Sequence, residues 1–282
     1  MPYKVVMCKN CGLMYINPVP SKEELNNFYV HKYESYYGIP AQYGDSNFKV
    51  RGYEIYDFLK GNVETAEKIL EIGAGGGGNI LGLSEKYNSK ELAVIEPGAG
   101  SNISLSTIGV QIIGEFYDEE ILDLRRFDLI VLSHVLEHFY EPKEVLRKIW
   151  NDTAENVNLF IAIPSLSAIN KETFNYSSKM EDYWLRVVHL TYFHQKNIED
   201  MLRITGWKIK KKQKKNGELF ILAEKNSKPD KEGSIQNVYE EHLNEVLYYK
   251  NMTDFIVLYK RHDQEEKRLI LFGASNMENK HI

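Results

Sequence analysis

The chain has 282 residues, 43% of them hydrophobic, a formal net charge of −5 and two cysteines. This length can bury one substantial core, enough for a domain of about 200 residues with appendages. The negative charge argues against a nucleic-acid partner, and no apolar stretch reaches the roughly 18 residues that span a bilayer. The chain also lacks a signal-peptide pattern and a disulfide framework, so we expect a soluble, cytoplasmic protein without a membrane partner.

Residues 1–60 form the first predicted segment, which begins with a cysteine pair. Cys8 and Cys11 are two residues apart and are followed by glycine, the spacing of half a zinc ribbon. A structural zinc needs four ligands, and the chain has no second cysteine pair; His31 would still leave the set incomplete. We therefore favour a metal-free turn over bound zinc, and redox use of the pair is less favoured still.

The rest of this segment is predicted to be mainly helical. Ser21 with Glu24 three residues later is the pattern of a capping box. Six aromatic residues follow, namely Phe28, Tyr29, Tyr33, Tyr36, Tyr37 and Tyr43. Most are expected to pack the helices on the core, and two or three are expected to line a lid, because such rings can flank a cation and exclude water.

Residues 69–96 predict a strand, a glycine turn, a helix and a second strand. Gly73, Gly75 and Gly78 fit G-x-G-x-x-G, in which absent side chains let the backbone approach a ligand. Glu96 closes the second strand about 20 residues later, where a carboxylate can accept both hydrogens of a ribose diol. Glycine turns without a ligand also occur, but the surrounding elements indicate a nucleotide-cofactor site.

Glu71 ends the first of these strands, two residues before the glycine turn. Together with Glu96 it would repel a pyrophosphate, which argues against a nicotinamide dinucleotide. A cofactor with a cationic sulfonium and no phosphate suits both acids. S-adenosylmethionine is such a cofactor.

From about residue 5 to 225 the chain resembles the class I S-adenosylmethionine-dependent methyltransferases. The resemblance implies a Rossmann-like α/β fold with a doubly wound sheet of seven strands, the last of them antiparallel. In that family the glycine turn wraps the methionine moiety and the second-strand acid holds the ribose. The residues that it places at the cofactor are Glu71, Gly73, Gly75, Gly77, Gly78, Glu96, Pro97, Glu115, Ser133 and His134. On the acceptor side it favours Tyr33 and Tyr37 as lid residues.

The sequence from His134 to His138 also spells an inverted zinc-peptidase motif. That chemistry needs both histidines on one helix face, whereas here Phe127 to Ser133 is a continuous apolar strand. The motif therefore lies at the carboxyl end of a strand, at the edge of the cofactor crevice, and a peptidase is rejected. The resemblance makes His134 a candidate catalytic residue, and Glu137 and His138 are expected to stabilise the start of the next helix.

Beyond this motif the alternation of elements continues. We predict an amphipathic helix at Pro142–Trp150, a fifth strand at 158–165, and a strand pair joined at Asn216-Gly217. The lysines between Lys208 and Lys215 are expected to protect an exposed sheet edge. This completes a central domain at residues 61–225.

The acceptor pocket is expected between residues 165 and 200. His189 takes the position of a histidine that is proposed to act as base in sugar C-methyltransferases, and histidine suits proton removal near neutral pH. His194 is the second candidate for contact with the acceptor. A purely structural role stays open for both.

Residues 226–282 begin as a polar linker, followed by a predicted helix from Val238 to about Lys267 and a final strand. The chain resembles the sugar C-methyltransferases at both ends. Some of those enzymes begin with a small zinc ribbon, of which the chain has half, and in such relatives a strand similar to this final one starts a second domain. One helix and one strand cannot build such a domain. We therefore favour a truncated C-terminal domain over an extension that forms a homodimer.

These resemblances predict methyl transfer from S-adenosylmethionine, with S-adenosylhomocysteine as product. The expected acceptor is a small molecule, most specifically a nucleotide-linked sugar or other carbohydrate, in carbohydrate biosynthesis. The alternatives are a non-catalytic S-adenosylmethionine-binding protein and an NAD-dependent oxidoreductase.

Overall fold

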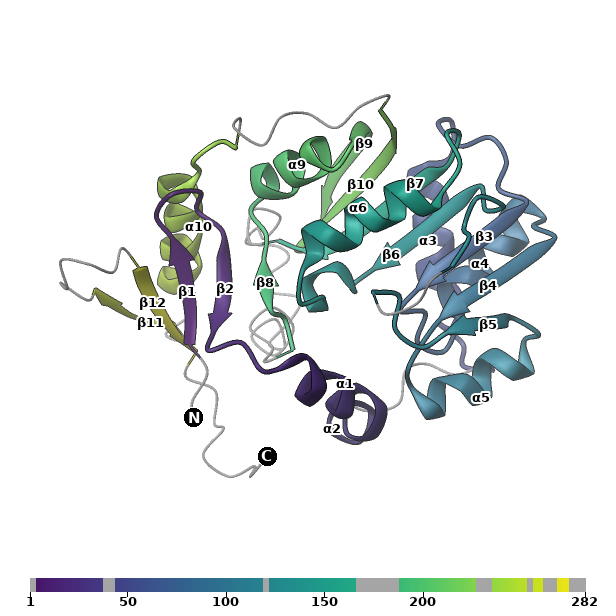
Figure 1. The fold of residues 1–282 in the computed structure, drawn as a ribbon, viewed down its shortest axis with the longest axis horizontal. Coiled ribbons are helices and arrows are strands. Elements are labelled where there is room, and N and C mark those ends of the chain that lie inside the picture. The colour runs from purple at the N-terminus through teal and green to yellow at the C-terminus, as the bar shows by residue number, and fades with distance from the viewer. Residues whose placement is uncertain are drawn as a thin grey trace.

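The computed structural model describes residues 4–37, 44–118, 122–165, 188–226, 235–252, 256–260 and 268–273. Within these ranges the strands form a seven-stranded sheet of order β5-β4-β3-β6-β7-β10-β9 and a five-stranded sheet of order β11-β12-β1-β2-β8 (Figure 1). The helices that these ranges contain are all too short or too polar to cross a membrane.

The larger sheet is the predicted one. Its strands are β3 (Lys68–Ile72), β4 (Glu91–Ile95), β5 (Gln111–Gly114), β6 (Leu129–Ser133), β7 (Asn158–Pro164), β9 (Trp207–Lys215) and β10 (Glu218–Lys225). The first five pair in parallel, while β10 runs antiparallel to both β7 and β9. This confirms the mostly parallel sheet with a reversed last strand. Asn216 and Gly217 both have positive φ in the turn between β9 and β10, as the hairpin signal predicts.

Helices cover both faces of this sheet (Figure 1). They are α3 (Val50–Leu59), α4 (Gly78–Tyr87) and α5 (Ala99–Thr107) on one face, and α6 (Pro142–Asp152) and α9 (Gln195–Ile204) on the other. Alternate residues of β6 face the two layers: Leu129 and Val131 pack with the first group, Ile130 and Leu132 with the second. All five residues of β6 are buried, as expected of a strand covered on both faces.

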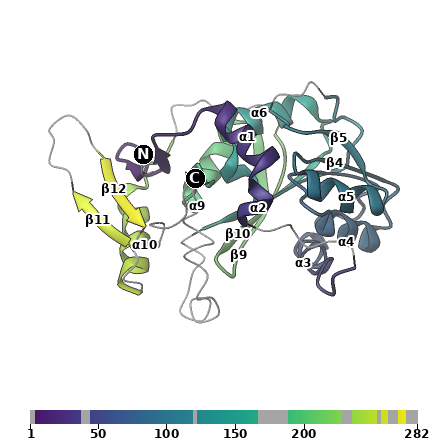
Figure 2. The ribbon, with the colours of Figure 1, turned by 90° about the horizontal axis from the view of Figure 1, so that it is seen from below.

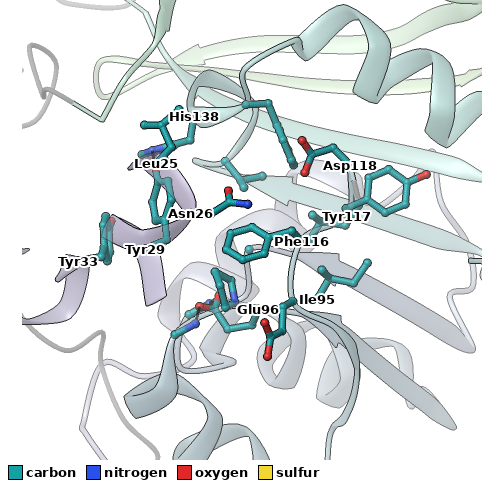
Figure 3. Close-up of a pocket in the computed structure, with 18 of the residues that line it drawn as sticks. Leu25, Asn26, Tyr29, Tyr33, Ile95, Glu96, Phe116, Tyr117, Asp118 and His138 are labelled. Atoms are coloured by element: carbon teal, nitrogen blue, oxygen red, sulfur yellow. Dashed lines mark hydrogen bonds between the residues drawn. The ribbon is translucent and has the colours of Figure 1, made fainter. Parts of the chain in front are cut away.

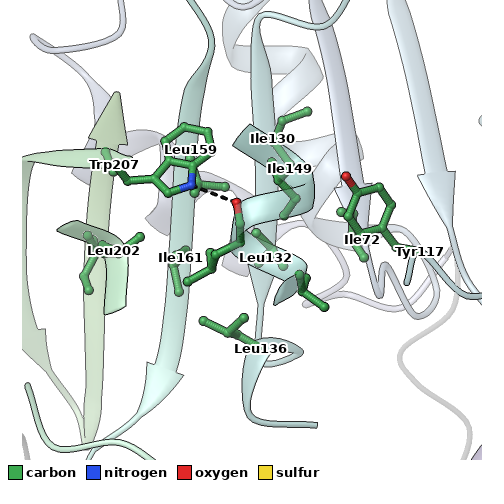
Figure 4. Close-up of a cluster of buried hydrophobic side chains, with 14 of the residues drawn as sticks. Ile72, Tyr117, Ile130, Leu132, Leu136, Ile149, Leu159, Ile161, Leu202 and Trp207 are labelled. Carbon is green, nitrogen blue, oxygen red and sulfur yellow. Dashed lines mark hydrogen bonds between the residues drawn. The ribbon is translucent and has the colours of Figure 1, made fainter. Parts of the chain in front are cut away.

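Trp207, at the start of β9, packs into the hydrophobic cluster between the sheet and helices α6 and α9 (Figure 4). Its indole N–H donates to the backbone carbonyl of Leu146 in α6 at 3.0 Å, so the one polar atom of the ring is satisfied inside the core. This contact holds α6 against the strands whose ends carry the site.

Helices α3 and α4 approach each other closely through glycines. A Cβ at Gly82 would lie 2.7 Å from the Lys49 carbonyl oxygen and 3.0 Å from the Gly52 Cα. Such distances leave no space for a side chain. The contact fixes the position of α4, and with it the glycine turn from which α4 begins.

The smaller sheet was not predicted. It contains β1 (Lys4–Cys8), β2 (Met14–Asn17), β8 (Thr191–Tyr192), β11 (Ile256–Lys260) and β12 (Arg268–Gly273). Strand β12 pairs with β1 and β11 pairs with β12, both antiparallel. The C-terminal strand β12 thus finds its partner near the N-terminus of the same chain, a pairing that we did not predict. The truncated C-terminal domain stays a prediction.

Helix α10 (Tyr239–Met252) precedes β11. The predicted helix continued to about Lys267, and this part of the prediction is wrong, since residues 256–260 form a strand. The β-branched and aromatic residues Ile256, Val257 and Tyr259 favour that conformation.

Two short helices, α1 (Lys22–His31) and α2 (Tyr33–Tyr37), form a lid. The predicted capping box is present: the Ser21 hydroxyl accepts from the Glu24 N–H, and the Glu24 carboxylate accepts from the Ser21 N–H. Seen from below, the lid crosses in front of the larger sheet (Figure 2). It covers the edge where the parallel strands end.

Candidate active site

A cavity lies between the lid and the carboxyl ends of β3, β4, β5 and β6 (Figure 3). About 1010 Å³ of space lies between these elements, and part of it is open solvent. The described residues that line it come from α1, α2, the glycine turn and the segments that follow β4, β5 and β6. The site therefore lies where open α/β sheets bind ligands.

The glycine turn forms one wall. Gly73, Gly75 and Gly77 have φ values of 72°, 52° and 87°, a conformation that favours glycine. Gly73 and Gly75 line the cavity. Gly77 and Gly78 lie deeper, at the start of α4, where a Cβ on Gly78 would be 2.0 Å from the Phe48 carbonyl oxygen. Both glycines therefore pack closely behind the turn, and their contact with the cofactor stays a prediction.

Glu96 and Pro97 lie beside this wall and both line the cavity. The Glu96 carboxylate accepts hydrogen bonds from the N–H groups of Gly75, at 2.7 Å, and Gly98, at 2.8 Å. Burial raises its pKa, and these two hydrogen bonds oppose the shift. The carboxylate is thereby fixed at the mouth of the glycine turn.

Glu71 has a different environment from the one predicted. Its carboxylate is fully buried and accepts from the Asn79 side-chain amide at 2.7 Å and from the Ile80 N–H at 3.1 Å. Burial raises its pKa to about 8, although both hydrogen bonds oppose the shift. Glu71 therefore connects β3 to the first turn of α4, and its direct contact with the cofactor stays a prediction.

The segment after β5 forms the opposite wall. Glu115 lines the cavity, and the Phe116 ring extends into it (Figure 3). The contact of Glu115 with the cofactor stays a prediction. The Lys22 ammonium lies 2.9 Å from the Asp118 carboxylate, which connects the lid to this wall. Phe116 and Asp118 were missed, although an aromatic and an acid directly after a parallel strand were an available signal.

His134 follows β6 with a φ of 56° and lines the cavity. Its Nε2 lies 3.1 Å from a Glu218 carboxylate oxygen and 3.1 Å from Arg51 Nη2, and its Nδ1 lies 3.5 Å from Glu137 Oε1. Burial lowers the pKa of His134, but the two carboxylates outweigh this effect and raise it above its usual value. Ser133, the other predicted residue here, is a buried residue of β6.

Glu137 lies in a short 3-10 helix, η1 (Leu136–His138). The prediction that it stabilises the start of the next helix is wrong, because α6 begins only at Pro142 and Glu137 turns inward with 1% of its surface exposed. Three histidines surround its carboxylate: His134, His138 and His189. The Leu190 N–H donates to the Glu137 carbonyl at 2.9 Å, which brings His189 to this position.

His138 lines the cavity, and its Nδ1 lies 2.6 Å from the Tyr29 hydroxyl. His189 sits behind it with 3% of its surface exposed, and the two rings meet at right angles with centroids 4.9 Å apart. His138 thus lies between the cavity and His189, the predicted catalytic histidine. For His138 we had predicted only a role at the start of the next helix.

The other residues predicted to contact the acceptor are Tyr33, Tyr37 and His194, and they lie in different places. Tyr33 lines the cavity beside Tyr29, while the side chain of Tyr37 lies outside the described residues. His194 begins α9, where its Nδ1 accepts from the Lys196 N–H and its Nε2 lies 3.4 Å from Glu245. The structure places it beside α10, and its contact with the acceptor stays a prediction.

Cys8 and Cys11 are free thiols: Cys8 is the last residue of β1, and Cys11 lies in the turn between β1 and β2. Burial raises the pKa of Cys11, and the Gly12 N–H donates to the Cys8 carbonyl at 2.8 Å. Among the described residues, no group of three side chains that could bind a metal lies at this turn. The metal-free turn stays our preferred interpretation.

Comparison with known proteins identifies the family. A family model described as a methyltransferase domain matches residues 50–212. The chain therefore belongs to this family, and it is an S-adenosylmethionine-dependent methyltransferase. A search of curated proteins found no match.

Solved structures show the same fold at low sequence identity. A Pyrococcus horikoshii OT3 protein has a TM-score of 0.53 at 12% identity, over 69% of this chain and 98% of that one. A putative methyltransferase of Haloferax volcanii, solved with the Trm112 activator, has a TM-score of 0.52 at 10% identity, over 66% and 94%. The Streptomyces davawensis riboflavin-analogue dimethyltransferase RosA has a TM-score of 0.50 at 16% identity, over 62% and 54%.

Proposed function

We propose that this chain methylates a small acceptor bound between the lid and the segment after β6. The observation that carries the proposal is the Glu96 carboxylate, which the N–H groups of Gly75 and Gly98 hold beside a wall without side chains. A carboxylate so fixed can accept both hydrogens of a ribose diol, while the bare backbone of Gly73 and Gly75 leaves room for the adjoining part of the donor.

The other walls fit the rest of S-adenosylmethionine. Ile95 and Phe116 offer apolar surface suited to a purine, and Glu115 lies next to them as a polar group for its edge. When bound, this cofactor supplies a methyl group already activated by its sulfonium. The chain's own task is then to position the acceptor and exclude water, which can contribute several kcal/mol.

For the acceptor we propose a nucleotide-linked sugar or another carbohydrate. The support is the sequence resemblance at both chain ends, together with three polar side chains at the lid end of the cavity: Asn26, Tyr29 and His138. Amide, phenol and imidazole groups can hydrogen-bond sugar hydroxyls. His134, on the same wall, is proposed to orient the acceptor, and His189 is proposed as a positioning residue that acts through His138.

The test begins with calorimetric titration of the protein with S-adenosylhomocysteine and, separately, with NAD. We expect micromolar binding of the first alone. Binding of NAD alone would overturn the proposal. Incubation with S-adenosylmethionine and a panel of sugar nucleotides, with S-adenosylhomocysteine formation followed by mass spectrometry, then tests the acceptor class. Product formation only with acceptors that lack a sugar would refute the carbohydrate assignment.

A further inference from the structure

We propose that Glu137, His138 and His189 bind a divalent cation at the lid end of the cavity. One donor atom from each of these side chains can be chosen so that all three lie within 4.8 Å of one another. Glu137 and His138 are neighbours in η1, and the fold brings His189 to them from the segment just before β8.

The distances suit one shared ion. Glu137 Oε1 lies 3.8 Å from His138 Nε2 and 4.0 Å from His189 Nε2. Ligand bonds to tetrahedral zinc are about 2.0–2.2 Å long, so its donor atoms lie roughly 3.3–3.6 Å apart. Both pairs are slightly wider than this, and small inward movements of the side chains would let a single cation bind all three donors.

The second observation that supports a cation site is that the Glu137 carboxylate is buried without accepting a hydrogen bond. Its side chain is 1% exposed, and within the described part of the chain neither carboxylate oxygen accepts a hydrogen bond. A buried carboxylate without such bonds is unfavourable unless a positive charge or a metal compensates it. In the described structure His134, His138 and His189 are the cationic or potentially cationic groups beside this carboxylate, while the Arg51 guanidinium pairs with Glu218 at 2.6 Å. His134, whose pKa the carboxylates raise, supplies part of the compensating charge, and a metal bound by the other two imidazoles would supply the rest.

The surrounding contacts are those that hold metal-binding histidines. The Tyr29 hydroxyl lies 2.6 Å from His138 Nδ1, which fixes the ring so that Nε2 faces Glu137. Metal-ligating histidines commonly have such a partner on the other ring nitrogen, and its loss typically weakens metal affinity about 10–100-fold. His134, on the other side, lies 3.5 Å from the same carboxylate and can orient it.

Two imidazoles and one carboxylate favour Zn²⁺, Fe²⁺ or a similar transition ion over Mg²⁺. Three protein ligands leave at least one position open, and His138 lines the cavity, so that position is accessible from the acceptor side. This role rests on the proposed function: a carbohydrate hydroxyl of the acceptor would complete the coordination and be held for methylation.

The test uses the full chain, treated with a chelator and then titrated calorimetrically with Zn²⁺ alone. A variant with Cys8→Ser and Cys11→Ser serves as the background, because the thiol pair is another place where zinc can bind. We expect one saturable site per chain in this background. In it, Glu137→Gln and His138→Gln should each weaken binding at least tenfold, while His31→Gln, on the exposed surface of the lid, should leave it unchanged.

Tyr29→Phe provides a variant that keeps the ring packing if the buried substitutions impair folding. We expect it to weaken zinc affinity about tenfold through loss of the hydroxyl next to His138. The proposal is overturned if the cysteine-free background binds no zinc, or if Glu137→Gln and Tyr29→Phe leave binding intact. Titration with S-adenosylhomocysteine separates the two proposals: donor binding without zinc binding refutes only the cation site, and the reverse refutes only the donor site.

Discussion

The carboxylate of Glu34 accepts two hydrogen bonds from Ser101, one from its backbone N–H at 2.9 Å and one from its hydroxyl at 3.1 Å. It also accepts one from the Gly100 N–H at 2.9 Å. Glu34 belongs to the lid helix α2, and Ser101 lies in the first turn of α5, just after Glu96. A lid side chain thus caps a helix of the core, where a negative charge is favourable.

Replacing Glu34 with alanine should loosen the lid. The loss of hydrogen bonds to a charged acceptor corresponds to roughly 1–3 kcal/mol. We expect faster hydrogen exchange in α1 and faster dissociation of S-adenosylhomocysteine. Glu23→Ala, an exposed acid on α1, is the control. Equal exchange in the two variants would show that the cap does not hold the lid.

Glu96→Ala should remove the predicted ribose contact. Hydrogen bonds to a charged group contribute about 1.5–3 kcal/mol, so we expect the calorimetric dissociation constant of S-adenosylhomocysteine to rise roughly 10–100-fold. Glu64→Ala, an exposed acid at the opposite end of the sheet, should not change it. Unchanged affinity in Glu96→Ala would remove the ribose assignment.

Gly82→Ala tests the contact between α3 and α4, since two physical effects predict opposite signs. Helix propensity alone would stabilise the protein by about 1 kcal/mol. The added Cβ, however, would lie 2.7 Å from the Lys49 carbonyl oxygen. Overpacking of this kind costs about 1–3 kcal/mol, so we expect a lower free energy of unfolding. Denaturant unfolding measures this free energy, and stabilisation by Gly82→Ala would contradict the close packing.

The features predictable from the sequence have local signals. The apolar run of β6, the glycines after β3 and the turn at Asn216-Gly217 each depend on neighbouring residues, and the larger sheet follows from them. The same holds for the capping box at Ser21. The position of Glu96 beside the glycine turn was predictable, because one helix and one strand set its distance from that turn along the chain.

The features that were missed depend on contacts between distant residues. Nothing near Glu137 in the sequence shows that η1 turns its carboxylate inward or that His189 meets it from a segment about fifty residues away. The pairing of β12 with β1 joins the two ends of the chain and has no periodic signature. Tyr29 is one of six aromatic residues in its segment, and the sequence does not show that it is the one that contacts His138.

His242 is a buried histidine remote from the cavity, in α10. It has no measurable exposed surface, and its Nδ1 lies 2.7 Å from the Gly12 carbonyl oxygen, to which it donates. His194 of α9 contacts its ring with centroids 5.4 Å apart, and Glu245 is the acidic group in its surroundings. Burial lowers the pKa of His242 to about 4, although the Gly12 hydrogen bond and Glu245 oppose the shift.

This depressed pKa predicts a loss of stability in acid that His242→Asn should reduce. Unfolded histidine has a pKa of about 6.5, so between about pH 6.5 and 4 the unfolded chain binds the additional proton and the folded chain does not. The free energy of unfolding therefore falls as the pH falls through this window, by up to about 3 kcal/mol from this one group.

Asparagine at position 242 keeps a donor for the Gly12 carbonyl but does not titrate. Denaturant unfolding between pH 7 and pH 4 should give a shallower decline for His242→Asn than for the wild type, whereas His31→Asn, at the exposed end of α1, should follow the wild type. Parallel declines in all three proteins would mean that His242 is protonated without penalty in the folded state, and that acid sensitivity comes from other groups.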